Sequence, residues 1–101
     1  MSEYLLAEKT DGIQVLTLNR PQKKNAVNTE MWIGLREAFR AAAADDSVRC
    51  LLLCGAGDNF CSGVDLASFN DAASGEEHPF ESAARAVVEF DKPLIAAAQG
   101  V

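Results

Sequence analysis

The sequence Cys50-Leu-Leu-Leu-Cys54 runs directly into Gly55-Ala-Gly-Asp-Asn-Phe-Cys-Ser-Gly-Val-Asp-Leu66, and this junction decides the fold. A short, continuous apolar run bounded by turn residues is typical of a strand buried in a parallel sheet. A loop rich in glycine exposes backbone N–H groups, which can stabilise a developing negative charge. The junction therefore predicts a buried strand that ends in a loop suited to bind an anion.

The residues before this junction predict a hairpin, a helix and a parallel strand pair. Residues 4–9 and 13–19 are β-rich and flank Thr10-Asp11-Gly12, a strong hairpin signal. The second run is apolar on both parities, so we expect it to be covered on both faces. Asn28 or Thr29 is the expected N-cap of a helix that runs to about Ala44. Strand, helix and strand in this order favour a right-handed crossover. The apolar stripe of that helix comprises Met31, Leu35, Ala38, Phe39 and Ala42.

The last third of the chain predicts a second crossover. Residues 67–78 are polar and typical of a surface loop, and Pro79 suits the first turn of a helix. Asp91-Lys92-Pro93 ends that helix, and residues 94–98 favour another buried strand. Because such a strand needs cover on both faces, we expect residues 1–101 to be the N-terminal portion of one larger domain. The apolar positions of the second helix are Phe80, Ala83, Ala84, Val87 and Val88.

Composition narrows the classes of protein and partner. The 101 residues are 49% hydrophobic, which fits one globular domain, and the net charge of −6 disfavours nucleic acid as a partner. No apolar run reaches the length of a membrane span and no leader is visible, so we expect a cytoplasmic protein without a membrane partner. Arg20, Lys23 and Lys24 fall within five positions. This cluster fits either a small anionic ligand or a solvated turn.

The cysteines and the single histidine indicate neither a metal site nor a disulfide framework. Cys50, Cys54 and Cys61 form no metal-ligand spacing with each other or with His78. Cys50 and Cys54 are expected to be small core residues. Cys61 as a nucleophile lacks a visible base. We therefore expect Cys61 to be a packed residue and His78 to be solvated.

Two familiar glycine motifs fail at this loop. A dinucleotide-binding fingerprint that begins at Gly55 needs glycine at position 60, which is Phe60. A nucleophile elbow around Ser62 needs glycine at positions 60 and 64, which are Phe60 and Val64. Neither motif explains the loop.

Three segments carry a family resemblance: residues 18–26 (Leu-Asn-Arg-Pro-Gln-Lys-Lys-Asn-Ala), the glycine loop at 55–66, and residues 92–100 (Lys-Pro-Leu-Ile-Ala-Ala-Ala-Gln-Gly). In this order they resemble the crotonase superfamily, the enoyl-CoA hydratase/isomerase family. The resemblance spans essentially the whole chain. It implies an α/β fold of the crotonase-like ββα-spiral type, of which this chain is the N-terminal, incomplete portion.

The resemblance also implies a site for a coenzyme A (CoA) thioester. In the family, two backbone N–H groups bind the thioester oxygen, and the first of them falls on Val64 here. Gly63, the residue before Val64, lets the chain turn, and Asp65 is expected to bond to nearby backbone. Where some members carry lysine directly after the proline, this chain has Gln22. The implied CoA neighbours are Lys23 or Lys24 at the phosphates, and Ala26, Ser62, Gly63, Asp65 and Leu66 along the rest of the molecule.

The implied activity is hydration of a 2-enoyl-CoA or shift of a 3-enoyl to a 2-enoyl double bond, in fatty-acid or related acyl-CoA metabolism. The substrate is the CoA thioester, and no permanent cofactor or metal is implied. The family is usually trimeric or hexameric. Its acid and base carboxylates follow the last shared motif, so Glu76, Glu77 and Glu81 receive no role, and the isolated 101 residues are expected to be inactive. The alternatives are another crotonase reaction (thioester hydrolysis, dehalogenation or decarboxylation) or a non-catalytic acyl-CoA-binding or scaffold homologue.

Overall fold

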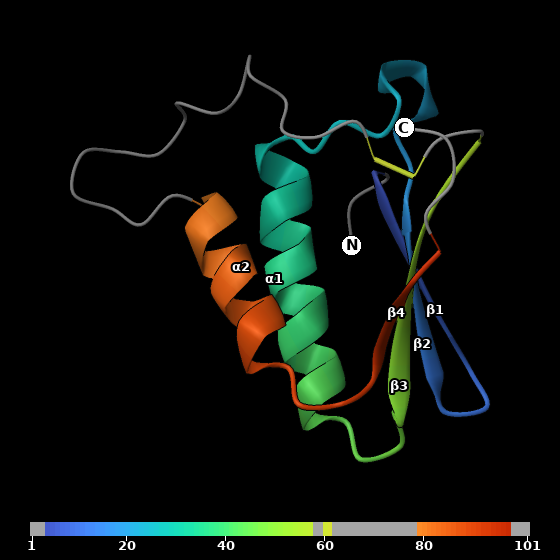
Figure 1. Cartoon of the computed structure of the whole chain (residues 1–101), viewed down its shortest axis with the longest axis vertical. Helices are drawn as coiled ribbons and strands as arrows, with labels where there is room; N and C mark the ends of the chain where they lie inside the picture. The colour runs from blue at the N-terminus through green and yellow to red at the C-terminus, as the bar shows by residue number, and fades with distance from the viewer. Residues whose placement is uncertain (1–3, 58–59, 62–78, 98–101) are drawn as a thin grey trace.

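The computed structural model describes residues 4–57, 60, 61 and 79–97. Its four strands form one sheet in the order β1-β2-β3-β4, and both helices lie side by side on one face of that sheet (Figure 1). The predicted α/β class is confirmed. The predicted loop at 67–78 lies outside the described residues. The elements are β1 (Leu5–Thr10), β2 (Ile13–Leu18), the short 3-10 helix η1 (Pro21–Lys23), α1 (Thr29–Ala44), β3 (Cys50–Gly55), α2 (Pro79–Glu89) and β4 (Leu94–Ala96).

The Asp-Gly pair makes the predicted hairpin between β1 and β2. Asp11 and Gly12 have φ angles of 50° and 83°, which is the double positive φ of the turns that join antiparallel strands tightly. Arg49 closes over this turn, since its Nη2 donates to the Asp11 carbonyl at 2.7 Å and its backbone N–H to the Gly12 carbonyl at 2.7 Å. A Cβ at position 12 would lie 2.6 Å from Arg49 Nε. The positive φ and the closeness of the Arg49 side chain therefore both favour glycine at position 12.

Helix α1 begins where the sequence predicts and buries the predicted stripe. Asn28 is the N-cap, because its Oδ1 accepts a hydrogen bond from the Met31 N–H at 2.9 Å. The crossover from β2 to β3 makes a parallel pair, with Leu16 opposite Leu53. The buried residues of α1 are Met31, Leu35, Ala38, Phe39 and Ala42. Within the described ranges, no helix is long and apolar enough to cross a membrane.

The end of α1 is held by a lysine from a distant segment. Lys92 Nζ donates to the carbonyls of Ala42 and Asp45, both at 2.8 Å. The last turn of α1 contains no basic residue of its own. Since the carbonyls at a helix C-terminus carry partial negative charge and lack partners within the helix, an ammonium group placed there stabilises it. The lysine of the Lys92-Pro93 motif thus ties the start of β4 to the end of α1.

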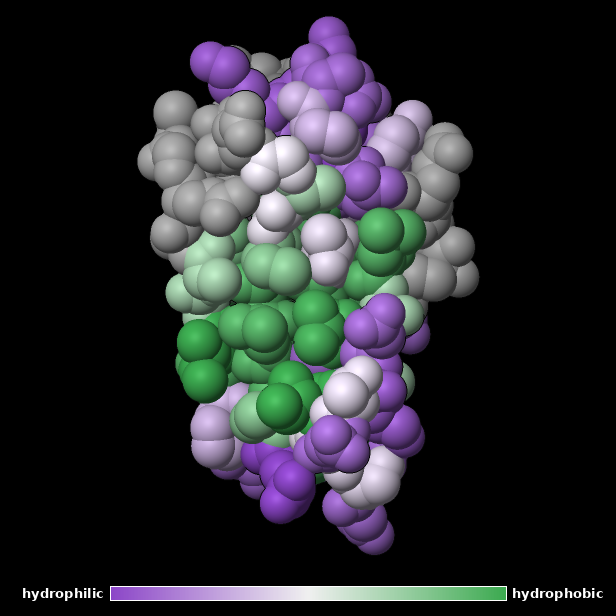
Figure 2. All heavy atoms as spheres, turned by 90° about the vertical axis from the view of Figure 1, so that its right-hand side faces the viewer, coloured by the Kyte–Doolittle hydropathy of each residue, from purple (hydrophilic) through white to green (hydrophobic). Residues whose placement is uncertain are grey.

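Within the described residues, the helices cover one face of the sheet. They bury Leu16 and Leu18 on that face of β2, whereas Ile13 on the other face is 38% exposed, so the expected cover on both faces of β2 is absent here. Strand β4 exposes 41% of Leu94 and 56% of Ile95, in line with the expectation that this strand needs cover from the rest of a larger domain. Figure 2 shows the resulting apolar band on the face away from the helices. Hydrophobicity identified the strands correctly, but it does not report which layer of the described structure covers them.

Helix α2 packs through small residues rather than through its valines. Ser82, Ala83 and Ala86 are buried, whereas Val88 is 83% exposed. Small side chains let α2 approach α1 closely, and the rings of Phe39 and Phe90 meet edge to face with centroids 5.3 Å apart. The prediction of Val88 on the buried face was therefore wrong, because the valines at 87 and 88 lie beside, and not within, the contact stripe.

An acid-sensitive contact lies where α1 ends. The Ser47 hydroxyl and N–H donate to Asp45 Oδ1 at 2.7 and 2.9 Å, and Lys9 Nζ donates to Oδ2 at 3.0 Å. These hydrogen bonds, those from Ser47 first and that from Lys9 next, hold the pKa of Asp45 well below its ordinary value.

We predict that Asp45→Asn lowers the stability of the fold near neutral pH and costs progressively less in acid. A carboxyl with a lowered folded-state pKa stabilises the fold above its unfolded pKa of about 4, and this contribution disappears as the pH falls through the folded-state pKa. Urea unfolding as a function of pH measures the effect, with the exposed neighbour Asp46→Asn as the control. A cost for Asp45→Asn that is the same at neutral and at acid pH would contradict the assignment.

Candidate functional site

The segment after β2 folds into a compact turn. Pro21 opens η1, and the backbone N–H groups of Lys23, Lys24 and Asn25 donate to carbonyls of Arg20 or Pro21 at 2.9–3.0 Å. Lys24 and Asn25 then adopt left-handed φ angles of 52° and 58°. Two successive left-handed residues reverse the chain tightly, so the turn presents its side chains from a fixed backbone.

The structure separates the three clustered basic residues. Lys23 and Lys24 are both exposed on the turn. The Arg20 side chain instead stabilises the turn. Its Nη1 donates to the Ala26 carbonyl at 3.1 Å, and its guanidinium carbon lies 5.8 Å from the centre of the Tyr4 ring. Ala26, a predicted CoA neighbour, is half-buried and donates its N–H to the Lys23 carbonyl at 3.0 Å. The two lysines are therefore the cations of this cluster that face solvent.

Sequence reasoning gave no role to Asn25, which the structure places at the centre of the turn. Its side chain is fully buried, at 0% exposure. Its Oδ1 accepts from the Arg20 N–H at 2.8 Å, and its Nδ2 donates to the Ala56 carbonyl at 2.9 Å. Asparagine tolerates left-handed φ and bonds readily to nearby backbone, which was the available signal. The contact with Ala56, thirty-one positions away, carried no signal in the sequence.

The described start of the glycine loop lies against this turn. Ala56 directly follows β3, and its N–H donates to the Leu18 carbonyl at 2.8 Å. Gly57 has a φ of 78°, and a Cβ there would lie 3.2 Å from Pro21 Cβ. At the other described end, Cys61 packs against the core. The turn that carries the two lysines and the exit of β3 thus form one packed unit.

The other predicted residues of the loop cannot be placed. Ser62, Gly63, Val64, Asp65 and Leu66 lie outside the described residues. The oxyanion role of the Val64 N–H and the CoA contacts of its neighbours stay predictions. Lys23, Lys24 and Ala26 are the predicted site residues that the structure brings together.

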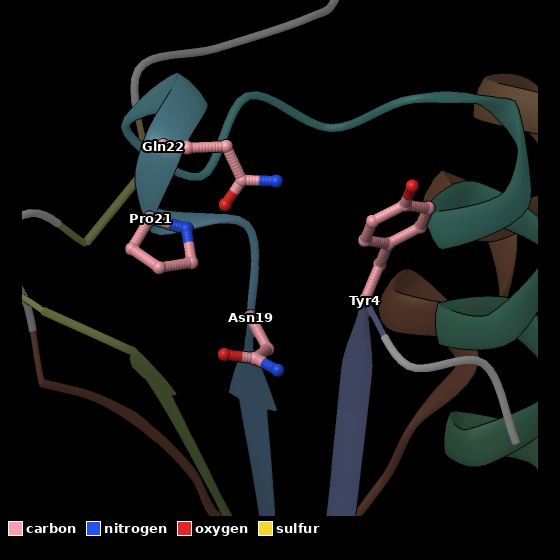
Figure 3. Close-up of a pocket in the computed structure, with 4 residues that line it drawn as sticks. All are labelled: Tyr4, Asn19, Pro21 and Gln22. Atoms are coloured by element: carbon pink, nitrogen blue, oxygen red, sulfur yellow. The ribbon is translucent and has the colours of Figure 1, made fainter.

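An open pocket of about 370 Å³ lies on the other side of the turn, between β1 and η1. Tyr4, Asn19, Pro21 and Gln22 line it, and Figure 3 shows the Gln22 amide extending toward the Tyr4 ring. Gln22, at the position where the resemblance implies lysine in some family members, lines this pocket and carries no charge. Lys23 and Lys24, the next two residues, are therefore the exposed cations of the turn.

Among the described residues, no three or more His, Cys, Asp or Glu side chains are grouped so that they could hold a metal ion. Cys50, Cys54 and Cys61 are free thiols, and all three are half-buried. The predicted core placement of Cys50 and Cys54 is thus only partly met, since both lie on the sheet face that the helices do not cover.

Comparison with known proteins defines the class. The model of the enoyl-CoA hydratase/isomerase family matches residues 8–101, and the chain belongs to that family. Its structure resembles that of an enoyl-CoA hydratase/isomerase from Pseudoalteromonas atlantica T6c, with a TM-score of 0.87 and 30% identity over 94% of this chain and 38% of that one. The predicted crotonase-type fold is confirmed.

Two relatives show how far the chain is similar in sequence to known proteins and how much of their length it covers. The chain is 38% identical over 109 residues to 1,2-epoxyphenylacetyl-CoA isomerase of Escherichia coli (strain K12), covering 100% of this chain and 42% of that protein. It is 41% identical over 106 residues to enoyl-CoA delta isomerase 2 of Homo sapiens, covering 97% and 27%. The chain therefore spans less than half the length of either relative.

We predict that Gly57→Ala destabilises the protein by about 1–2 kcal/mol, because alanine resists a φ of 78° and its Cβ would press on Pro21. The matched control is Gly34→Ala in α1. There alanine favours the helix by about 1 kcal/mol, but its Cβ would lie 3.1 Å from Cδ2 of the fully buried Leu5, so we expect a smaller net change than at position 57. Urea unfolding compares the two variants, and equal effects would contradict the packed geometry at position 57.

Proposed function

We propose that the full-length protein binds a CoA thioester and stabilises the enolate-type anion formed from it, as an enoyl-CoA hydratase or enoyl-CoA isomerase. The observation that carries the proposal is the family match over residues 8–101, which includes all three motif segments. The relatives named above are an isomerase of an epoxide CoA ester and an enoyl-CoA delta isomerase, so both handle CoA thioesters by name.

The nucleotide half of the substrate is assigned to the turn. CoA carries phosphate groups, and ammonium groups bind phosphate as point charges. Lys23 and Lys24 are exposed on a turn whose backbone is fixed by hydrogen bonds. Ala26 supplies the neighbouring backbone. Charge and rigidity together support CoA-phosphate binding here over a merely solvated turn.

The thioester half is assigned to the loop that β3 enters. A thioester enolate concentrates negative charge on oxygen, and one well-placed N–H donor can lower the barrier by about 3 kcal/mol. In our proposal Val64 supplies that N–H, and Gly63 lets the chain turn toward the oxygen. Ser62, Asp65 and Leu66 border the CoA. The fixed exit of β3 at Ala56 supports this arrangement, since the loop starts from an anchored position.

The reaction itself is chosen by groups that we do not assign to this chain. Hydration and double-bond shift share the enolate and differ in the acid and base that move protons. Other crotonase reactions, and a non-catalytic acyl-CoA-binding role, stay alternatives on the same site. A homotrimer or hexamer stays a prediction from the resemblance, and a cytoplasmic location stays a prediction from the sequence.

We predict that replacing a lysine that contacts phosphate, by Lys23→Ala or by Lys24→Ala, weakens the binding of acetoacetyl-CoA by about fivefold. The loss should shrink as salt rises, because exposed ionic contacts are screened. Isothermal titration at low and high salt measures both effects. Arg40→Ala, which removes one exposed cation from α1, is the control. Parental affinity in the Lys23→Ala, Lys24→Ala double variant at low salt would overturn the phosphate assignment.

We predict that Val64→Pro lowers kcat on a 2-enoyl-CoA or 3-enoyl-CoA substrate by about a hundredfold or more, since proline has no N–H to give the oxyanion. Val64→Ala keeps the N–H and should keep most of the activity. Steady-state kinetics measure kcat, and circular dichroism checks that both variants fold. A folded Val64→Pro variant with parental kcat would remove Val64 from the oxyanion hole.

A further inference from the structure

We propose that Asn25 is a positioning residue, which fixes the lysine-bearing turn to the exit of β3 and so holds the two ends of one CoA thioester at a set separation. For its substrate the proposal rests on the proposed function. The mechanical link between the two segments rests on the structure alone.

The link consists of one side-chain amide that bonds in two directions. Oδ1 accepts from the Arg20 N–H at 2.8 Å on the turn side, and Nδ2 donates to the Ala56 carbonyl at 2.9 Å on the β3 side. The side chain is 0% exposed, so water does not compete for either bond. A polar group that is left buried without a hydrogen-bond partner destabilises the fold, so both partners depend on the Asn25 amide.

Asparagine meets three demands at this position at once. It must accept on one side and donate on the other, which an aspartate carboxylate cannot do. It must carry no charge, because an unpaired charge is costly in a buried position. It must also adopt a φ of 58°, which asparagine tolerates better than most residues other than glycine. A residue chosen for solvation alone would need none of these.

The consequence for the substrate follows from geometry. The turn carries Lys23 and Lys24, and Ala56 begins the loop that leads toward the thioester half of the proposed site. A substrate held at both places reacts only if their separation is right, and a misplacement of about 1 Å can cost a hundredfold in rate. Loosening Asn25 should therefore reduce kcat more than it reduces affinity for CoA.

Two variants at position 25 divide the link. Asn25→Gly permits the left-handed φ and removes both hydrogen bonds. Asn25→Asp keeps the acceptor for Arg20 and removes the donor to Ala56. The matched control is Lys92→Met, which also removes two side-chain bonds to backbone, at Ala42 and Asp45 beside the far end of α1.

The test measures amide hydrogen exchange at the Arg20 N–H and the carbon chemical shift of the Ala56 carbonyl in the full-length protein without substrate, and then kcat and the dissociation constant of CoA. Exchange at the Arg20 N–H should quicken in Asn25→Gly, which removes its acceptor, and should change less in Asn25→Asp, which keeps it. The Ala56 carbonyl shift should change in both variants, because both remove the Nδ2 donor. Both variants should lose about tenfold or more in kcat while their CoA dissociation constants change less than about threefold. Lys92→Met should lose stability and keep both kinetic values. If Asn25→Asp fails to fold, Asn25→Gly carries the test, because it buries no charge and permits the left-handed φ.

The outcomes separate the inference from the proposed function. Parental kcat in a position-25 variant whose Ala56 carbonyl shift has changed would overturn the positioning role, as would a kcat loss that Lys92→Met reproduces. If the protein neither binds CoA nor turns over CoA thioesters, the proposed function fails, and the Arg20 exchange and the Ala56 carbonyl shift then decide whether Asn25 joins the segments. An unchanged Ala56 carbonyl shift in Asn25→Gly would overturn that link.

Discussion

The buried amide of Asn25 is the constraint on which the candidate site depends. It satisfies the Arg20 N–H and the Ala56 carbonyl together, at 0% exposure. Because buried polar groups are costly when unpaired, the turn and the exit of β3 cannot move apart without leaving the Asn25 Nδ2 and the Ala56 carbonyl unpaired with each other. The same amide bonds fix the backbone of the turn that carries the exposed residues Lys23 and Lys24. The candidate site therefore combines an uncharged, buried amide with two positively charged side chains at the surface.

The C-terminal end of α1, far from the Asn25 turn, is held by contacts of charged side chains. Lys92 reaches the carbonyls of Ala42 and Asp45, and the Asp45 carboxylate in turn accepts from Ser47 and Lys9. Charge placed on helix carbonyls stabilises the helix end directly. These contacts join the C-terminal end of α1 to β1 and to the segment before β4, at the end of the sheet opposite the exits of β2 and β3 (Figure 1).

Local signals in the sequence predicted the elements well. Asp11-Gly12 gave the hairpin and Asn28 the start of α1, because both depend on neighbouring backbone. Long-range contacts were invisible: neither the bond from Asn25 to Ala56 nor that from Lys92 to α1 follows from periodicity. The exposure of Val88 was missed for the same reason, since hydrophobicity does not show which layer covers a residue. The family followed from three motifs in order, whereas the oxyanion role of Val64 came only with the family resemblance.

The most direct test is a crystal structure of the full-length protein with a CoA thioester analogue, such as acetoacetyl-CoA. The account predicts the thioester oxygen within hydrogen-bond distance of the Val64 N–H, about 2.7–3.1 Å. It also predicts a CoA phosphate beside Lys23 or Lys24, with the Asn25 bonds to Arg20 and Ala56 intact. A thioester oxygen bound elsewhere, or CoA seated away from the turn, would contradict it.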